Sequence, residues 1–535
     1  MNKYISYSIL LSLFLFGCTD FLDKKDPTAT TFVEFFNNEE DLRRVIYSSY
    51  LDVFTNPQST QLMFYMDEGK SDNAYSRVES YHHQVIANGN YNSNTSTFLF
   101  YYELYMKHLG RLNTFIANSD VPYLEDEAVR AKYKSILEGL RVWHYFRLTA
   151  RWGDVPFHLE PADLVTALQP VKPKEEILNI LFPLAEQIAN RLPKDEYTTD
   201  KYMFNQYSMK ALTMRYALYN GRYELAARLA KEIIESGKYS LHPKYGDLFQ
   251  YTASTNNKEF IMWLDRASNA SRATRSFRDL GPHFRTGGGQ SYTVPLKALV
   301  DTYWTKQGRT IDNCPLHTKK EYELNPHLNR DPRYDATIFG HGDMFYGEEV
   351  DIYNENSPMY YEKTRASRSG YWFKKFVSDA DAFKANGDGT MEFGMLRYAE
   401  VLLTYAEAKI MMGEPDALAK TCINQIRQRA GLDMTVADVT LPAFAGYTKQ
   451  QWTDLIRNER RIELAGEGQR YDDIIRWKTA EVVLNQPALG HTREEDGQLV
   501  SLKIEDRTFR PHNYLWPFHE NSLRVEPGLK QNPGY

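Results

Sequence analysis

Residues 208–236 predict two helices that pack against each other across a short turn. Apolar side chains recur at helical spacing on both sides of this turn, at Ala211, Met214, Ala217 and Leu218 and then at Ala226, Ala230, Ile233 and Ile234. This spacing gathers them on one face of each helix, which must then be buried. The segment Asn220-Gly221-Arg222-Tyr223 reverses the chain between the two faces. The fold must therefore contain an antiparallel helical hairpin.

A second pair of the same kind lies in the last third of the chain. Residues 396–410 carry an apolar helical face, Gly413-Glu414-Pro415 turns the chain, and residues 417–430 return. Gly221, Tyr223 and Ala226 of the first pair resemble the turn of a tetratricopeptide repeat, where a small residue lets two helices approach closely. The two pairs predict a predominantly all-α fold, with tetratricopeptide-like helix pairs in a divided scaffold.

Periodicity also divides the chain into regions. Helical spacing at residues 39–54 and 135–150 assigns residues 32–241 to an N-terminal helical region, and residues 391–535 form a C-terminal helical region and tail. Between them, residues 242–390 hold short segments separated by Gly, Asn, Asp and Pro. So long an irregular stretch is uncommon in a compact domain unless it is functional. We expect it to be a loop-rich, ligand-binding subdomain.

The first residues predict export and a lipid anchor. Lys3 precedes an apolar run over residues 4–16, which is shorter than the roughly 20 residues needed to span a bilayer. Residues 1–17 therefore fit a signal peptide. They end in Leu15-Phe16-Gly17-Cys18, which is similar to a lipobox, and the alternative is a chance cysteine after an ordinary signal. Lipidation of Cys18 would hold the chain on a membrane, with the polar residues 18–31 as a tether.

Composition narrows the classes of partner. The formal net charge is −6, which argues against nucleic acid, because phosphate contacts need clustered Lys and Arg. The chain holds 38 Tyr, 28 Phe and 8 Trp, and a tyrosine joins a flat apolar face to a hydroxyl group. Beyond Cys18 there are only Cys314 and Cys422, too few for a disulfide scaffold, and their pairing stays open.

Several short motifs follow one another in an order that resembles a known family. They are Cys18-Thr19-Asp20-Phe21-Leu22-Asp23, Trp152-Gly153-Asp154-Val155-Pro156, Arg330-Asp331-Pro332-Arg333, Leu396-Arg397-Tyr398-Ala399-Glu400, Arg457-Asn458-Glu459-Arg460-Arg461 and Gln531-Asn532-Pro533-Gly534-Tyr535. Each motif alone is weak, but their order over the chain resembles the SusD/RagB family of outer-membrane nutrient-binding lipoproteins of Bacteroidetes. One departure is Trp152, which stands where the family has tyrosine.

The resemblance implies a fold, a ligand and a partner. It implies a helical fold with a loop-rich ligand face, on a lipoprotein held in the outer membrane and facing the cell exterior. It also implies oligosaccharide binding and delivery to a SusC-like TonB-dependent transporter. Two alternatives remain open: the same architecture binding peptides or another nutrient, or a lipoprotein glycoside hydrolase.

The residues themselves give little support for an enzyme. A glycosidase needs two carboxylates about 5 to 9.5 Å apart. The adjacent pairs Asp67/Glu68, Asp472/Asp473 and Glu494/Glu495 are more simply explained as solvated surface groups. His82 and His83 have no further ligands nearby, so we expect polar loop residues and no metal. We therefore predict a protein without catalytic residues or cofactors.

Glu459, Glu463 and Glu467 are spaced by four, and like charges at this helical spacing repel. They could form a cation or catalytic site, or they could pair with arginines between helices. The many arginines nearby favour the second interpretation. The candidate partners are Arg457, Arg461, Arg470 and Arg476.

A sugar-binding site should combine exposed aromatic rings with polar groups. A pyranose ring stacks its C–H groups on a flat ring, while its hydroxyls need amide, carboxylate or guanidinium partners. The irregular segments supply the candidates Tyr81, Tyr91, Asn92, Asn94, Trp263, Arg266 and Tyr292. For any one aromatic residue core packing is the commoner role. Residues 67–96 are the preferred segment, because the resemblance assigns the corresponding stretch to the binding face.

Overall fold

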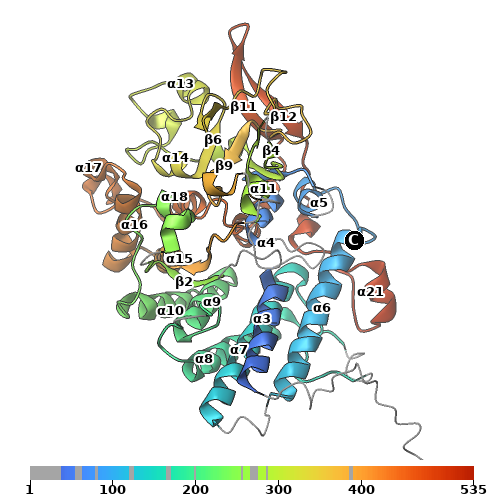
Figure 1. Ribbon diagram of the computed structural model, residues 1–535. Helices are drawn as coiled ribbons and strands as arrows, with labels where there is room; N and C mark the ends of the chain where they lie inside the picture. Colours follow the sequence, from blue (N-terminus) through green and yellow to red (C-terminus); the bar gives the residue numbers. More distant parts are fainter. Residues whose placement is uncertain are drawn as a thin grey trace, which may run out of the picture.

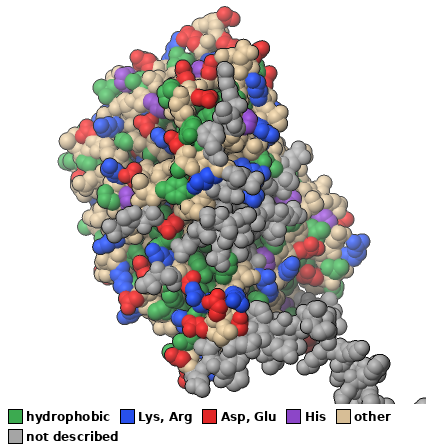
Figure 2. Space-filling model, viewed as in Figure 1, with side chains coloured by type: hydrophobic (Ala, Val, Ile, Leu, Met, Phe, Trp, Pro, Cys, Tyr) green, Lys and Arg blue, Asp and Glu red, His purple; other side chains and the backbone are tan. Residues whose placement is uncertain are grey.

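The computed structural model describes residues 38–54, 63–78, 82–119, 126–163, 170–197, 200–254, 257–264, 275–284, 287–382, 384 and 389–535. Helices fill one half of the molecule and loops with short strands fill the other (Figure 1). Acidic and basic side chains are interspersed on the face shown in Figure 2. Within the described ranges, every helix is too short or too polar to cross a membrane. The predicted signal, Cys18 and the tether lie outside these ranges.

Long helices build the scaffold. They are α3 (Glu39–Phe54), α6 (Ser96–Ala117), α7 (Glu127–Trp152), α8 (Lys174–Arg191), α9 (Gln206–Tyr219), α10 (Tyr223–Glu235), α15 (Tyr398–Met412), α16 (Ala417–Ala430) and α18 (Lys449–Glu463). Both predicted hairpins are confirmed, as α9–α10 and α15–α16. Helix α10 packs directly on α15, so the two distant pairs form one stack (Figure 1).

Local sequence explains where these helices begin and end. Asn205 and Ser208 form a reciprocal capping box at the start of α9, and Thr448 and Gln451 form another at α18. Between α9 and α10, Gly221 takes a left-handed conformation with φ of +70°, which a residue without a Cβ adopts most readily. The buried faces of α10 and α15 carry alanines, including Ala230 and Ala406, which allow close packing.

The strands are short and pair antiparallel in twos. Their bounds are β1 (Ala74–Ser76) with β5 (Thr293–Pro295), β2 (Phe260–Leu264) with β10 (Phe393–Arg397), β3 (His283–Phe284) with β4 (Gly287–Gly288), β6 (Ile338–Gly340) with β9 (Tyr371–Phe373), β7 (Met344–Phe345) with β8 (Glu348–Glu349), and β11 (Ala488–Glu495) with β12 (Gln498–Glu505). The β1–β5 pair joins the N-terminal region to the middle of the chain, with Tyr75 opposite Val294.

Short helices connect these parts. They are α4 (Met63–Met66), α5 (His83–Asn88), α11 (Ser276–Leu280), α12 (Lys297–Val300), α13 (Lys319–Leu324), α14 (Arg333–Thr337), α17 (Met434–Ala437), α19 (Arg470–Arg476), α20 (Ala480–Val483) and α21 (Glu520–Val525). Four of them, α11 to α14, lie within the predicted loop-rich range, whose boundaries stay a prediction. Cys314 and Cys422 are both free thiols.

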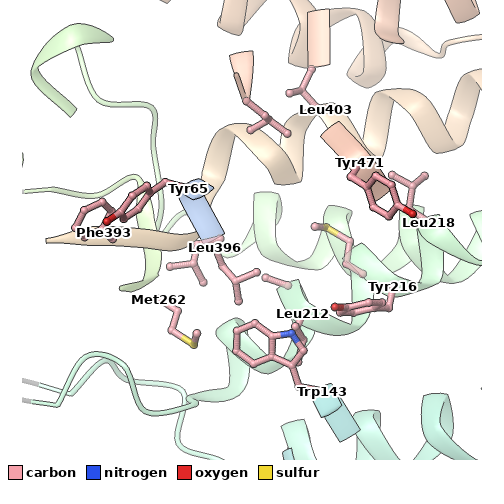
Figure 3. Packing of buried hydrophobic residues seen from close by; sticks show 14 of the residues in the cluster. Tyr65, Trp143, Leu212, Tyr216, Leu218, Met262, Phe393, Leu396, Leu403 and Tyr471 are labelled. Carbon is pink, nitrogen blue, oxygen red and sulfur yellow. The ribbon is translucent and has the colours of Figure 1, made fainter. Parts of the chain in front are cut away.

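One large hydrophobic core runs from the helices into the strands. Figure 3 shows Trp143 of α7 near Leu212 of α9, with Met262 of β2 and Leu396 of β10 alongside. Tyr65 stacks on Phe393 at 5.7 Å between ring centroids. The core therefore ties the strand pair β2–β10 to the helical stack.

A buried ion network surrounds the end of α18. Glu463 is the last residue of that helix, and Glu467 lies beyond it, after Gly466 with φ of +77°. Arg397 contacts Glu463 at 2.7 Å and Glu467 at 2.7 Å. The other cations at the three glutamates are Arg333, Lys375, Arg427 and Arg429.

The structural interpretation of these glutamates is thus confirmed, but the predicted partners were wrong. Arg461 and Arg470 pair with Asp72, and Arg476 pairs with Glu407 and Asp473. Arg457 lies over the ring of Trp477. The actual partners come from separate segments of the chain, which only the fold brings to the end of α18.

Candidate ligand-binding site

Tyr292 stands at the end of a tight turn that follows the glycine run. The turn is hydrogen-bonded to α11 and the residues after it: Gln290 N donates to Arg278 O at 2.6 Å, and Tyr292 N donates to Asp279 O at 2.6 Å. A Cβ at Gly289 would overlap the carbonyl oxygen of Gly281. The glycine therefore permits the close approach that fixes Tyr292, whose side chain is half-buried.

Arg77 lies against this ring. Its backbone N–H donates to Tyr292 O at 3.0 Å, and its Cζ lies 5.0 Å from the centroid of the Tyr292 ring. The Arg77 guanidinium is held by Gln290 O, which accepts from Nε at 3.0 Å. Arg278 approaches the same ring at 5.9 Å. A half-exposed tyrosine flanked by guanidinium donors has the chemistry that a sugar ring and its hydroxyls require.

Tyr75, Arg365 and Arg368 extend this surface. Burial and the nearby Glu505 raise the pKa of Tyr75, against the effect of Arg368. Burial lowers the pKa of Arg77, and the positive charges of Arg368 and Arg365 lower it further. Burial and Arg365 likewise lower the pKa of His283. We call Tyr75, Arg77, His283, Tyr292, Arg365 and Arg368 the Tyr292 face.

A buried aromatic column supports the Tyr292 face from behind. Phe284, Phe345, Phe339 and Trp372 stack in that order, with centroid separations of 6.0, 4.5 and 5.7 Å. Trp372 Nε1 donates to Ser291 Oγ at 2.9 Å, and Ser291 Oγ donates to Arg365 O at 2.9 Å. The turn before Tyr292 and the backbone of Arg365 are thus both linked to Trp372 of the buried aromatic column.

The other predicted site residues that the structure describes do not join Tyr292. The Tyr91 ring is 9% exposed and packs on Phe98 at 4.7 Å. Trp263 is 5% exposed on β2, with Lys201 Nζ 4.6 Å from its ring. Both rings have the packing of core residues and offer little face to a ligand.

Asn92 and Asn94 are exposed, but their side chains already form hydrogen bonds within the protein. Asn92 Oδ1 accepts from Asn94 N at 2.8 Å, and Asn94 Nδ2 donates to Glu520 Oε1 at 2.8 Å in α21. Tyr81 and Arg266 lie outside the described residues. The ligand role of all these residues stays a prediction, and Tyr292 has the best geometry among those described.

Residues between 246 and 379 line a concave surface. It is an open hollow of about 600 Å³ lined by Met344, Tyr346, Asp247, Asp335 and Lys374, among others. Tyr346 is 43% exposed. The charged side chains that line this hollow are three aspartates and one lysine, whereas the Tyr292 face presents arginines.

The acidic pairs and the two histidines are bound to their surroundings. In the first pair, Asp67 forms ion pairs with Lys70 and His83, and Glu68 accepts hydrogen bonds from Asn73 and Gly468. In the second, Asp472 pairs with Arg151, and Asp473 pairs with Arg460 and Arg476. In the third, Glu494 pairs with Lys320 and Glu495 with Arg493. Surface solvation was therefore the wrong explanation for Glu68 and Asp473, which are buried in such contacts.

His83 corrects the expectation of polar loop residues. It lies in α5 with 2% of its surface exposed and contacts Asp67 at 3.1 Å. His82 precedes that helix and is hydrogen-bonded to Thr97 Oγ1 at 2.9 Å. Among the described residues there is no group of acidic, His or Cys side chains suited to a metal ion.

Sequence reasoning missed five members of the Tyr292 face, one of which is His283 at the start of β3. Tyr75 and Arg77 lie inside the preferred segment 67–96, but neither was singled out. Arg365 and Arg368 follow one another in a polar stretch just before β9. Two arginines so close together, in a segment without helical periodicity, were a signal that could have indicated them.

Comparisons with known proteins agree with this architecture. The model of the SusD family matches residues 258–535. A SusD-like protein of Formosa agariphila is 25% identical, over 100% of this chain and 99% of its own length. A second from the same organism is 22% identical, over the full length of both chains.

Solved structures show the same fold. The crystal structure of a SusD-like carbohydrate-binding protein from Bacteroides fragilis has a TM-score of 0.81 at 24% identity, covering 93% of this chain and 100% of that one. A laminarin-binding SusD-like protein has a TM-score of 0.69 at 20% identity, covering 93% and 99%. The predicted helical, tetratricopeptide-like fold class is confirmed.

Proposed function

This chain belongs to the SusD family, and from that membership we propose that it is a cell-surface protein that binds oligosaccharides through the Tyr292 face. The observation that carries the proposal is the half-exposed Tyr292 ring with Arg77 Cζ 5.0 Å from its centroid. The ring offers a stacking surface, and the guanidinium groups offer donors to hydroxyl oxygens. Trp372 of the aromatic column binds Ser291, the residue before Tyr292, and Gln290 O holds the Arg77 guanidinium, so the site is ordered before a ligand arrives and less entropy is lost on binding.

The structural relatives support a glycan as the ligand. One is described as a carbohydrate-binding protein and another as laminarin-binding, and both share the fold over nearly all of this chain. The described carboxylate pairs are engaged by cations or amides, so binding without hydrolysis is the simpler proposal.

We further propose attachment and delivery. Lipidation at Cys18 would anchor the chain in the outer membrane, facing the cell exterior, with residues 18–31 as a tether. A SusC-like TonB-dependent transporter would then receive the oligosaccharide. The support for these two steps is the sequence motif at Cys18 and the family membership.

Isothermal titration of the whole chain against a panel of oligosaccharides and a panel of peptides tests the ligand. We expect heat from a glycan, an affinity about tenfold lower for Tyr292→Ala, and little change for Tyr292→Phe, which keeps the ring. Tyr346→Ala is the matched control, because it removes an exposed tyrosine from the neighbouring hollow.

Three results would contradict the proposal. Heat from peptides alone would assign the ligand to another class. Loss of glycan binding in Tyr346→Ala but not in Tyr292→Ala would move the site to the hollow. Continued release of new reducing ends from a bound polysaccharide would show hydrolysis.

A further inference from the structure

Among the described residues, three arginines of the Tyr292 face have no carboxylate within ion-pair distance. The Arg77 guanidinium donates to the carbonyl oxygen of Gln290 and lies over the Tyr292 ring, and Arg365 and Arg368 are exposed. Throughout the described ranges, no carboxylate forms an ion pair with any of the three. In the core the opposite holds, since Arg333 and Arg397 each contact three carboxylates.

The fold brings Arg77 and the Arg365 backbone to the same turn, and Arg368 lies three residues after Arg365. Arg77 lies over the Tyr292 ring. The backbone of Arg365 is bound to the same turn, because Ser291 Oγ donates a hydrogen bond to Arg365 O. The charges of Arg368 and Arg365 both act on Arg77, and the charge of Arg365 acts on His283. Like charges at such a surface repel one another unless an anion lies between them.

The acidic group near this surface is already engaged. Glu505 lies beside Tyr75, but its Oε1 accepts from Arg507 Nε at 2.9 Å and its Oε2 accepts from Gln84 Nε2 at 3.0 Å. It therefore neutralises Arg507, and the positive charge of Arg77, Arg365 and Arg368 remains.

We propose that the Tyr292 face binds an anionic glycan, with a sugar ring stacked on Tyr292 and a sulfate ester or uronate carboxylate held by Arg365 and Arg368. This inference rests on the proposed function and names its substrate class. Guanidinium groups bind sulfate and carboxylate oxygens through charge-assisted, often bidentate hydrogen bonds. Arg77 adds a third positive charge at the ring itself.

The attraction is local. The whole chain carries a formal charge of −6, and its visible face mixes both signs (Figure 2), so a polyanion gains nothing from the overall field. Binding of an anionic glycan must then depend on the few arginines of this surface. That dependence makes the inference testable with single substitutions.

The test compares polysaccharides that differ only in charge. Carrageenan and its desulfated form, and polygalacturonate and its carboxyl-reduced form, are run against the whole chain in affinity gel electrophoresis and titration calorimetry. We expect the charged form of one pair to bind about tenfold or more tightly than its neutral form, with an affinity that falls as salt is added.

Variants then assign the effect to the arginines. Arg365→Ala/Arg368→Ala should lower affinity for the charged polymer about tenfold and leave the neutral form within about twofold, and Arg365→Lys/Arg368→Lys should recover part of it. The matched control is Arg222→Ala/Arg524→Ala, which removes the same charge from the residue before α10 and from α21, away from β4 and α11 (Figure 1).

The outcomes separate this inference from the proposed function. Equal affinity for charged and neutral forms, with loss of both in Tyr292→Ala, would overturn the anionic preference and keep glycan binding. An equal loss in the control variant would assign the effect to general charge and overturn the inference. Absence of binding to any glycan, charged or neutral, would overturn the proposed function itself.

Discussion

The carboxyl group of Asp279 is buried beneath the turn that carries Tyr292. It accepts a hydrogen bond from Tyr65 Oη at 2.8 Å, and burial raises its pKa from 3.8 to about 7. Between these two values the folded protein keeps a proton that the unfolded chain has lost. The stabilising contribution of this group is therefore complete below about pH 4 and is lost as pH rises towards about 7.

Asp279→Asn should remove this pH dependence, because asparagine stays neutral and its Oδ1 can still accept from Tyr65 Oη. We expect the stability of the variant relative to the original to increase by at most about 1.4 kcal/mol for each unit from about pH 4 to about pH 7, and then to level off. Urea unfolding at a series of pH values measures this, with Asp506→Asn on the exposed surface as the control. A difference that stays constant with pH would show that Asp279 is ionised in the folded protein.

Residue type and local pattern did not separate binding aromatics from core aromatics. Tyr91, Trp263 and Tyr292 all lie in segments without helical periodicity in the sequence. In the fold, however, Tyr91 and Trp263 are buried, and each contacts a residue distant in sequence, Tyr535 and Lys201 respectively. Tyr292 differs because the glycine run before it turns the chain, and that run is visible in the sequence. The glycine run therefore identified Tyr292, because the position of Tyr292 depends on the backbone of the neighbouring residues.

Among the elements, the helical hairpins were predictable and the strand pairs were not. A helix buries a face set by its own periodicity, so α9–α10 and α15–α16 follow from spacing and turn residues alone. Each strand pair here has two to eight residues a side, and β1–β5 or β2–β10 joins segments far apart in sequence. The cations that neutralise Glu463 and Glu467 could not be predicted for the same reason, because they are far from these glutamates in sequence.

Arg397 joins several of these elements at the end of α18. It is the last residue of β10, and its guanidinium contacts Glu259 at 2.8 Å, Glu463 at 2.7 Å and Glu467 at 2.7 Å. Removing one partner of a buried ion network leaves charges without compensation. The stability of the junction between the helical scaffold and the strands is thus expected to depend strongly on this network.

We expect Arg397→Ala to lower the free energy of unfolding by about 3 to 5 kcal/mol. Arg493→Ala is the control, because Arg493 and Glu495 form a pair with 40% and 41% exposed side chains, and such pairs contribute about 0 to 1 kcal/mol. Thermal unfolding followed by circular dichroism compares the two. A loss in Arg397→Ala as small as in the control would mean that the other cations suffice for the three glutamates.

At the scale of the whole molecule, the end of the chain closes on the end of α7. Asn532 Nδ2 donates to Trp152 O at 3.0 Å and to Trp516 O at 2.7 Å. Tyr535 Oη donates to Leu515 O at 2.9 Å, and its ring stacks on Tyr91 at 6.3 Å. Two of the motifs that carried the family resemblance, at residues 152–156 and 531–535, therefore meet in space. Their order was visible in the sequence, whereas their contact depends on the complete fold.

Because Asn532 satisfies two carbonyl groups at once, Asn532→Ala should cost about 1 to 3 kcal/mol, the range for leaving buried polar groups unpaired. The effect should also be local. Hydrogen exchange should quicken at residues 91–98 and 152–155, while the α9–α10 hairpin, which packs on α8 and α15, should keep its protection. Lys530→Ala changes an exposed neighbour and serves as the control. Faster exchange over the whole chain would mean that the tail stabilises the molecule globally. Unchanged exchange at residues 91–98 would mean that the tail does not stabilise the N-terminal helices.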